Sequence, residues 1–452
     1  MIQMRLSSAA RVLDTGYSGH DVEFQGCSTD TRKLESGNLF IAIKGQNFDG
    51  NDFIEAAVNR GAVAALMGRQ DQVNLPCIVV DNVRRAMGQL AQAWRQHFQI
   101  PLVAITGSNG KTTVKEMLGS ILRLKAPVLS TVGNLNNDIG VPLTLYGLGN
   151  EHAYAIIEMG ANHAGEISWL SKIAVPTVAV ITQCAPAHLE GFGSIDGVAR
   201  AKAEIFEGLD RKGTAIINAD DDYAQYWTGK VRGLNYLSFG LEKPADITAV
   251  CSGGNKSSGS GRFRLITPAG SIDVALSLLG RHNVMNALAA AACAVCMDVD
   301  LETICRGLEE MKPVRGRLEM KQGIRNTTII DDTYNANPGS FRAAINVLTH
   351  FPGKHWLVLG DMGELGNETE LFHREAGRIA KSSGIEKLFT IGELGRFSTE
   401  EFGECAAHFE SHDDLLHGLR DVIEDGVHIL IKGSRSMHME KIVQGLEDKA
   451  PC

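Results

Sequence analysis

A glycine-rich segment at residues 107–113, Gly-Ser-Asn-Gly-Lys-Thr-Thr, has the residue types and spacing of a phosphate-binding loop. It follows an apolar run at 102–106 and precedes a helical pattern at 114–124. Backbone N–H groups at such a helix start point toward phosphate, while Lys111 adds positive charge and a threonine hydroxyl can reach Mg²⁺. We predict ATP binding by a shortened loop, since Ile105 stands where the full pattern has a glycine. The candidate residues are Gly107, Ser108, Asn109, Gly110, Lys111, Thr112 and Thr113.

Three further side chains are candidates for metal binding or catalysis. Glu158 ends an apolar strand, where P-loop folds place an acidic group that helps to hold the metal. His188 follows the next predicted strand, at the edge where parallel sheets bind ligands; the alternative is a surface histidine that only makes hydrogen bonds. Lys202 lies on a helix predicted at 197–209, and its composition alone indicates a solvated lysine.

Short apolar runs alternate with helical patterns, which indicates an α/β fold with largely parallel sheets. A chain of 452 residues is too long for one core, so we expect several domains. We predict a small N-terminal α/β domain at 1–82, a central P-loop-type domain with a mostly parallel sheet at 83–313, and a C-terminal Rossmann-like domain at 314–452.

Predicted strands populate each of these segments. In the first they are at 38–44, 62–67 and 77–80, with a helix at 52–60. In the second they are at 102–106, 154–158, 177–182 and 214–218, and in the third at 327–331, 356–359, 388–391 and 428–431. A Gly- and Ser-rich stretch at 252–261, between β-type segments at 246–251 and 262–267, predicts a hairpin.

Composition excludes several functions. Lys plus Arg number 44 against 53 for Asp plus Glu, and the basic residues are scattered, so nucleic acid is not an expected partner. No signal peptide or membrane-length apolar run is present, and the nine cysteines are irregularly spaced, so we expect a cytoplasmic protein with reduced thiols. We also expect a monomer.

Cys293 and Cys296 lie in an Ala-rich helical pattern at 286–297, which favours core packing over a zinc site.

An ordered series of motifs resembles the Mur ligase family. The series runs from the phosphate-binding loop to the third domain, so it is far more specific than any single motif. Its members are the loop at 107–113, Gly-Asn-Leu-Asn-Asn-Asp-Ile-Gly-Val-Pro at 133–142, the segment 188–194, Ala-Lys-Ala-Glu-Ile-Phe at 201–206, Gly-Arg-His-Asn-Val-Met-Asn-Ala at 280–287, Gly-Arg-Leu-Glu at 316–319 and Asp-Asp-Thr-Tyr-Asn-Ala-Asn-Pro at 331–338.

The resemblance implies the roles of the site residues. Lys111, His188 and Lys202 would be catalytic, and Lys202 would be carbamylated, which turns its ammonium into a carboxylate-like ligand for Mg²⁺. Thr112, Glu158 and His188 would complete the sites of two Mg²⁺ ions. Nucleotide contacts would come from Asn286, Arg317 and Asp332, and from Asn137 unless that residue only stabilises a turn.

Within the family, two regions resemble the member that adds D-alanyl-D-alanine to UDP-N-acetylmuramoyl-tripeptide during peptidoglycan precursor synthesis. They are the N-terminal segments 28–32 and 37–45, and the C-terminal segments 332–338 and 432–436. No Asp-Asn-Pro-Arg tetrapeptide, typical of the diaminopimelate-adding sibling, occurs, although this does not exclude a lysine-adding sibling. The implied substrate-binding residues are Ser28, Asp30, Thr31, Arg32, Tyr334, Asn335, Asn337 and Ser434.

The implied reaction forms an amide through an acyl phosphate made from ATP. Two alternatives stay open. A related ligase such as folylpolyglutamate synthetase would start near the phosphate-binding loop, whereas here a small domain precedes Gly107. A nucleotide-gated binding module would bind ATP without forming ADP in the presence of any peptide acceptor.

Overall fold

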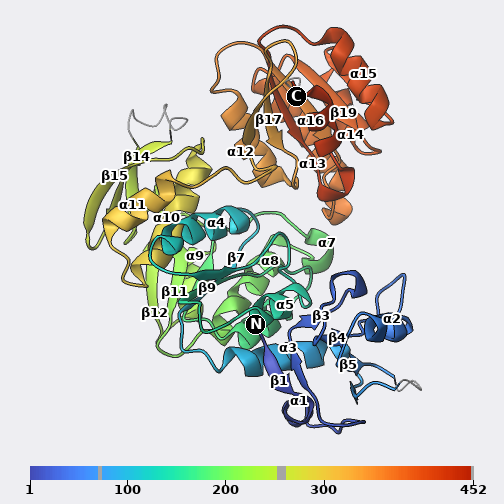
Figure 1. Ribbon diagram of the computed structural model, residues 1–452. Helices are drawn as coiled ribbons and strands as arrows, with labels where there is room; N and C mark the ends of the chain where they lie inside the picture. The colour runs from blue at the N-terminus through green and yellow to red at the C-terminus, as the bar shows by residue number, and fades with distance from the viewer. Residues whose placement is uncertain (70–73, 252–260, 449–452) are drawn as a thin grey trace.

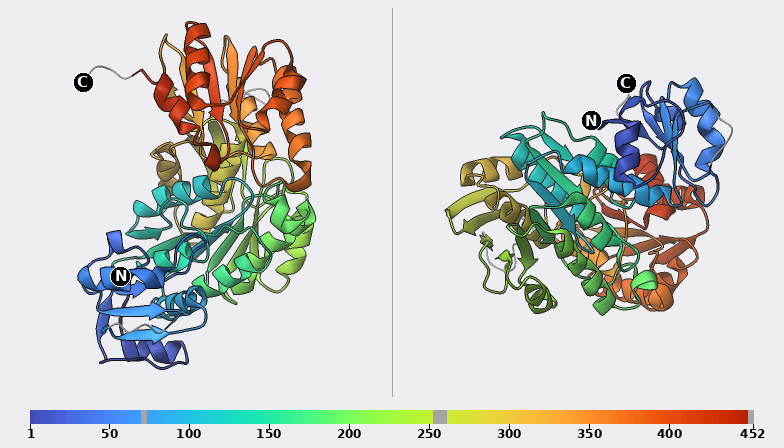
Figure 2. Two further views of the ribbon diagram at one scale, coloured as in Figure 1. Left: turned by 90° about the vertical axis from the view of Figure 1, so that its right-hand side faces the viewer. Right: turned by 90° about the horizontal axis from the view of Figure 1, so that it is seen from below.

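The computed structural model describes residues 1–69, 74–251 and 261–448. Its central domain lies between the other two, with the C-terminal domain at one end and the N-terminal domain at the other (Figures 1 and 2). This arrangement confirms the expected α/β fold of three domains. The predicted boundaries at 82 and 313 fall just before α3 (Val83–Arg95) and before β16 (Glu319–Gln322), and they stay predictions.

The N-terminal domain is built on a four-stranded parallel sheet in the order β3-β4-β5-β6. An antiparallel pair, β1 and β2, lies beside it. The strands are β1 (Gln3–Arg5), β2 (Glu23–Gln25), β3 (Cys27–Ser28), β4 (Leu39–Ile41), β5 (Ala64–Met67) and β6 (Cys77–Val79). The helices are α1 (Leu6–Val12), the 3-10 turns η1 (Thr31–Lys33) and η2 (Gly50–Phe53), and α2 (Ile54–Asn59).

The central domain contains a six-stranded parallel sheet in the order β12-β11-β10-β7-β9-β8. Its strands are β7 (Leu102–Thr106), β8 (Val128–Ser130), β9 (Tyr154–Glu158), β10 (Val178–Ile181), β11 (Thr214–Asn218) and β12 (Asn235–Phe239). A smaller antiparallel sheet has β13 (Thr248–Cys251), β14 (Arg262–Thr267) and β15 (Gly270–Ala275). Besides α3, the helices are α4 (Lys111–Arg123), α5 (Gly140–Tyr146), α6 (Glu166–Ala174), α7 (Leu189–Phe192), α8 (Ile195–Ala203), η3 (Glu204–Gly208), α9 (Ala224–Lys230), α10 (Arg281–Val295) and α11 (Leu301–Glu309).

Helices cover both faces of this central sheet because alternate residues of its strands point to opposite sides. In β7, Val103 and Ile105 pack with α4, α10 and α11. Leu102 and Ala104 pack instead with α3, α5 and α6, and this second core continues into the N-terminal domain. Cys293 is buried in the first of these cores, in keeping with the core-packing expectation.

The C-terminal domain is a second six-stranded sheet, in the order β16-β17-β21-β18-β19-β20, in which only β16 is antiparallel. The strands after β16 are β17 (Thr328–Asp332), β18 (His355–Gly360), β19 (Lys387–Ile391), β20 (Ala406–Phe409) and β21 (His428–Lys432). The helices are α12 (Pro338–Leu348), η4 (Gly366–Glu368), α13 (Thr369–Ser382), α14 (Gly395–Phe402), α15 (His412–Val422), η5 (Arg435–Met437) and α16 (Glu440–Leu446).

Some predicted bounds differ from the structure. The helix predicted at 114–124 begins three residues earlier, at Lys111, because Gly110, with a φ of 83°, ends the loop there. The helix predicted at 197–209 is α8 followed by the 3-10 turn η3. Apart from Gly261, the predicted hairpin tip lies outside the described residues. Within the described ranges, no helix is long and apolar enough to span a membrane.

Candidate active site

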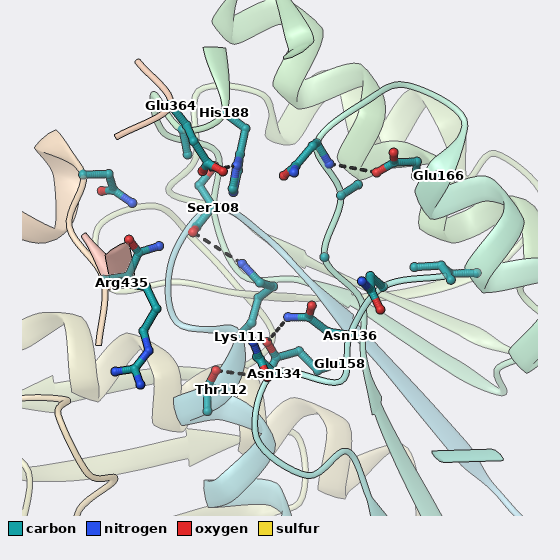
Figure 3. Close-up of a pocket in the computed structure, with 18 of the residues that line it drawn as sticks. Ser108, Lys111, Thr112, Asn134, Asn136, Glu158, Glu166, His188, Glu364 and Arg435 are labelled. Carbon is teal, nitrogen blue, oxygen red and sulfur yellow. Dashed lines mark hydrogen bonds and ion pairs between the residues drawn. The ribbon is translucent and has the colours of Figure 1, made fainter. Parts of the chain in front are cut away.

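A cavity of about 910 Å³ opens where the central domain meets the C-terminal domain and the start of α3. Figure 3 shows its floor, formed by the phosphate-binding loop and β9, with residues of the C-terminal domain on one side. Thirteen of the candidate residues line it: Ser108, Asn109, Gly110, Lys111, Thr112, Asn137, Glu158, His188, Arg317, Tyr334, Asn335, Asn337 and Ser434. The structure therefore gathers residues from 108 to 434 around one space.

The phosphate-binding loop is held tightly between the residue that follows β10 and the helix α10. Gly107 has a φ of 147°, and a Cβ there would lie 1.9 Å from Thr182 Oγ1. A Cβ on Gly110 would come 2.3 Å from Asn286 Oδ1, which places Asn286 directly behind the loop although it does not line the cavity. Lys111 begins α4 and donates from Nζ to the Gly107 carbonyl oxygen over 2.7 Å. Burial lowers the pKa of Lys111.

Glu158 is fixed by donors at the end of β9. Thr112 Oγ1 donates to Oε2 over 3.0 Å, and Asn136 Nδ2 donates to Oε1 over 2.8 Å. Lys115 Nζ lies 3.9 Å from Oε2 and donates to the Thr131 carbonyl oxygen over 2.8 Å. This lysine is 1% exposed. The carboxylate and the Thr112 hydroxyl therefore form a pre-arranged pair of oxygens, the donor type that Mg²⁺ prefers.

His188 reaches the same cavity from the start of α7. Its Nδ1 lies 2.6 Å from Glu364 Oε2 of the C-terminal domain (Figure 3). Apart from this contact, the buried Nδ1 has no polar partner. The imidazole lowers the pKa of the Glu364 carboxyl. Both residues have left-handed backbones, with φ of 52° and 62°, each of which costs roughly 1–3 kcal/mol in a non-glycine residue.

Lys202 is buried in α8 with 1% of its surface exposed, so the expectation of a solvated helix residue is wrong. Its Nζ lies 5.5 Å from the centre of the Phe192 ring. Burial, with a smaller contribution from the charge of Lys111, lowers the pKa of Lys202 to about 7. It does not line the cavity, and neither does Thr113, which is buried in the first turn of α4.

Residues of the C-terminal domain contact the phosphate-binding loop directly. Asn337 Nδ2 donates to Asn109 Oδ1 over 2.7 Å, and Arg317 Nη2 donates to Thr112 Oγ1 over 3.5 Å. The Arg317 guanidinium stacks over the Tyr334 ring at 4.1 Å. Asn109 Nδ2 and Arg317 Nε are buried donors without partners, and both residues line the cavity. Acceptor oxygens of a bound nucleotide would satisfy them.

Two candidates have other contacts in the structure. Asp332 does not line the cavity; its Oδ2 accepts from the buried Lys432 Nζ over 2.5 Å. Asn137 Oδ1 accepts from the backbone N–H of Gly140 over 2.9 Å, which matches the turn-stabilising alternative, although the residue also lines the cavity.

The N-terminal candidates lie outside this cavity. Asp30 accepts from the backbone N–H of Arg32 over 2.9 Å and pairs with the guanidinium of Arg32, whose side chain is 85% exposed. Ser28 Oγ donates to the Asp30 carbonyl oxygen over 2.8 Å, and Thr31 begins η1. At the N-terminal end the cavity is instead bounded by Arg84 and its neighbours in α3.

Sequence reasoning missed several residues that shape the cavity or hold its side chains. Arg84 Nη1 donates to Asp138 Oδ2 over 3.1 Å, and the Arg85 guanidinium stacks on Trp169. The others are Lys115, Asn136 and Glu364. Asn136 lies within the 133–142 motif, but nothing in sequence spacing marks the lysine or the glutamate. In the described part of the chain, no three His, Cys, Asp or Glu side chains form a metal cluster, so any cation here would use mixed donors.

Comparison with known families gives one consistent result. The model described as "Mur ligase family, catalytic domain" matches residues 23–103. "Mur ligase middle domain" matches residues 105–294, and "Mur ligase, glutamate ligase domain" matches residues 316–435. The three matches follow one another in the order of the three domains.

Individual relatives match over nearly the whole chain. A UDP-N-acetylmuramoyl-tripeptide--D-alanyl-D-alanine ligase of Escherichia coli (strain K12) is 43% identical, and the match covers 100% of both proteins. The enzyme of that name from Bacillus subtilis (strain 168) is 36% identical, and the match covers 93% of this chain and 93% of that enzyme. A crystal structure of MurF from Acinetobacter baumannii has a TM-score of 0.93 and 37% identity, covering 99% of this chain and 100% of that one. MurF ligase from Thermotoga maritima in complex with ADP has a TM-score of 0.82 and 27% identity, covering 93% and 96%.

Proposed function

The chain belongs to the Mur ligase family, and from that premise we propose that it uses ATP to join D-alanyl-D-alanine to UDP-N-acetylmuramoyl-tripeptide through an amide bond. This reaction makes a peptidoglycan precursor. The observation that carries the proposal is that the phosphate-binding loop and Glu158 line the same cavity as Arg317 and Asn337 of the C-terminal domain. Full-length relatives with the name of this ligase support the choice of substrates.

The chemistry requires activation of the peptide carboxylate, because its oxygen is a poor leaving group. The carboxylate oxygen attacks the γ-phosphorus of ATP, the bond to the β–γ bridging oxygen breaks, and ADP leaves. The amine of D-alanyl-D-alanine then attacks the carbonyl carbon of the acyl phosphate and gives up a proton. The tetrahedral intermediate expels phosphate and leaves the amide.

The proposed nucleotide contacts follow the positions of the side chains. Lys111 and the first N–H groups of α4 would hold the β- and γ-phosphates, because they offer positive charge and unpaired donors at a helix start. Asn109 and Arg317 would donate from their unpartnered nitrogens. Asn286 and Asp332 are proposed to contact the nucleoside from outside the cavity lining, on the family resemblance alone.

We further propose that Thr112, Glu158 and His188 hold Mg²⁺, in two sites that share these donors. Bound there, the ions would neutralise charge on the transferring phosphoryl group. A carbamate on Lys202 would add an anionic oxygen. This modification is supported by the position of the amine, since a buried ammonium beside the charge of Lys111 is desolvated and repelled.

The substrate ends would lie in different places. The UDP end is proposed to bind the N-terminal domain at Ser28, Asp30, Thr31 and Arg32, and the amine to approach Tyr334, Asn335, Asn337 and Ser434. The proposal places the reaction in the cytoplasm, where ATP and UDP-linked precursors are available, and treats the enzyme as a monomer.

Solved folylpolyglutamate synthase structures share the fold at 16% identity, with a TM-score of 0.65 for one of them.

An isotope experiment tests the proposed path. UDP-N-acetylmuramoyl-tripeptide labelled with ¹⁸O in its terminal carboxylate is incubated with the enzyme, ATP, Mg²⁺ and D-alanyl-D-alanine. The masses of the products are then measured by mass spectrometry. An acyl phosphate carries one labelled oxygen into the released phosphate and leaves an amide-linked pentapeptide. Formation of the pentapeptide with unlabelled phosphate would overturn the acyl-phosphate step, and absence of the pentapeptide would overturn the ligase assignment.

A further inference from the structure

His188 and Glu364 meet across the boundary between the central and C-terminal domains. His188 stands between β10 and α7, while Glu364 stands between β18 and η4. Their side chains approach to 2.6 Å between Nδ1 and Oε2 inside the cavity, and Figure 3 shows them side by side above the phosphate-binding loop. The pair therefore exists only while the two domains lie together.

The segment that carries Glu364 is held rigidly by its own domain. The backbone N–H of Gly363 donates to Ser434 Oγ over 2.7 Å, and the backbone N–H of Ser434 donates to the Asp361 carbonyl oxygen over 3.0 Å. The backbone N–H of Met362 donates to the buried His373 Nε2 over 3.0 Å. Glu364 is thus presented to the cavity by fixed neighbours.

The two loops also fit closely where they touch. A Cβ on Gly366 would lie 3.5 Å from the Glu190 backbone, so the segment after Glu364 packs directly on the segment after His188. Both paired residues hold a left-handed backbone that non-glycine residues rarely adopt. Strain of this kind persists where the surrounding structure fixes a conformation, and it concentrates at functional sites.

The contact determines which imidazole nitrogen carries a proton. Two lone pairs held 2.6 Å apart would repel each other, so Nδ1 must carry the proton that faces the carboxylate. Nε2 of the neutral ring then keeps its lone pair for a ligand. A carboxylate that accepts from one nitrogen in this way fixes both the tautomer and the orientation of a metal-binding histidine.

We propose that Glu364 is a positioning residue that acts through His188, so that the histidine becomes competent only when the C-terminal domain closes. Glu364 fixes the Nδ1–H tautomer and leaves the Nε2 lone pair available for a cation that the cavity would hold. The proposal rests on the function proposed above. It makes closure of the third domain a precondition for phosphoryl transfer, because the orienting carboxylate and the histidine belong to different domains.

A spectroscopic measurement tests the tautomer directly, without turnover. Protein labelled with ¹⁵N-histidine is studied by long-range ¹H–¹⁵N correlation in the presence of the ATP analogue AMP-PNP, and the His188 signals are identified by their loss in His188→Gln. The wild type should show a protonated Nδ1, and Glu364→Ala should show a mixture of tautomers. An unchanged tautomer in Glu364→Ala would overturn the proposal.

A double-mutant cycle tests the functional link. Glu364→Ala should lower kcat by roughly tenfold to a hundredfold, the usual loss for such a partner, while KM for D-alanyl-D-alanine changes little. In a His188→Ala background the same change should cost less than about twofold. Equal losses in both backgrounds, or a change confined to KM for D-alanyl-D-alanine, would show that Glu364 does not act through the histidine.

Two further variants separate positioning from folding and charge. Glu364→Gln keeps an oxygen that accepts from Nδ1–H and should recover much of the activity lost in Glu364→Ala. Glu368→Ala removes an exposed carboxylate four residues away that does not line the cavity, and it should leave kcat unchanged. Failure of wild-type enzyme to make the amide product would instead contradict the proposed function itself.

Discussion

Asn337 and Asn109 join the C-terminal domain to the phosphate-binding loop through one hydrogen bond, from Nδ2 to Oδ1 over 2.7 Å. The Asn337 Oδ1 atom at the same time accepts from the backbone N–H of Ser340 over 2.9 Å and caps α12. A single side chain therefore fixes the start of a helix and bridges two domains. The two roles can be separated by substitution, because capping needs only a short side chain with an oxygen acceptor.

Asn337→Ser and Asn337→Ala should lose the bridge equally but affect stability differently. Serine still caps the helix yet is too short to reach Asn109, so both variants should show the same several-fold fall in kcat/KM for ATP. Only alanine should lower the free energy of unfolding, by about 1 kcal/mol. Steady-state kinetics and urea unfolding check this, and a fully active Asn337→Ser would show that the bridge has no part in nucleotide use.

Lys115→Met should destabilise the protein strongly. The substitution leaves the Thr131 carbonyl oxygen without its donor and removes the cation 3.9 Å from Glu158, in a place where lysine is 1% exposed. Breaking a buried pair costs about 3–5 kcal/mol of unfolding free energy. Lys125→Met removes the exposed pair with Asp300 and should cost under about 1 kcal/mol. Urea unfolding measures both free energies, and a similar loss in Lys115→Met and Lys125→Met would contradict this account of Lys115.

Arg32→Ala should raise KM for the UDP-linked substrate alone. Arg32 is held by Asp30 and exposes its guanidinium in the N-terminal domain, far in the sequence from the loop that would hold ATP. Guanidinium groups bind phosphate oxygens through paired donors, which lysine does not offer in the same geometry. The control, Lys33→Ala, removes a neighbouring exposed charge and should leave the KM of each substrate unchanged. A uniform rise in KM for all three substrates would indicate a folding defect instead.

Lys202→Ala should lose activity that small carboxylates restore in part. The substitution leaves a cavity at a buried position of α8, into which acetate or formate could place an oxygen in lieu of the carbamate. Chloride at equal ionic strength should not restore activity, and Lys202→Arg should stay inactive because guanidinium cannot carry a carbamate. Full activity of Lys202→Ala without additives would remove this lysine from the metal site.

The fold was predictable where the sequence patterns were strong. Strands such as β7 and β10 are buried along their whole length, so they are recognisable as continuous apolar runs. Strands at the sheet edges, such as β8 and β16, carry partly exposed residues without such a run and were missed. The order of strands in each sheet depends on packing between distant segments, and no spacing along the chain encodes it.

The site was predictable in its loop but not in its supporting residues. The phosphate-binding loop has a local signature because glycines, lysine and threonine must follow one another at a helix start. Lys115 and Glu364 have no such signature, since a lysine on a helix and a glutamate in a loop are ordinarily solvated. Their roles arise only when folding brings Lys115 beside Glu158 and Glu364 beside His188.

The most direct test of the proposed reaction is the release of ADP with each combination of substrates. The enzyme is supplied with ATP and Mg²⁺, with or without UDP-N-acetylmuramoyl-tripeptide and D-alanyl-D-alanine, and ADP is followed by a coupled assay. Rapid turnover should require both, because domain closure should protect an acyl phosphate from water until the amine arrives. Equal ADP release from ATP alone would contradict the assignment of this chain as a ligase.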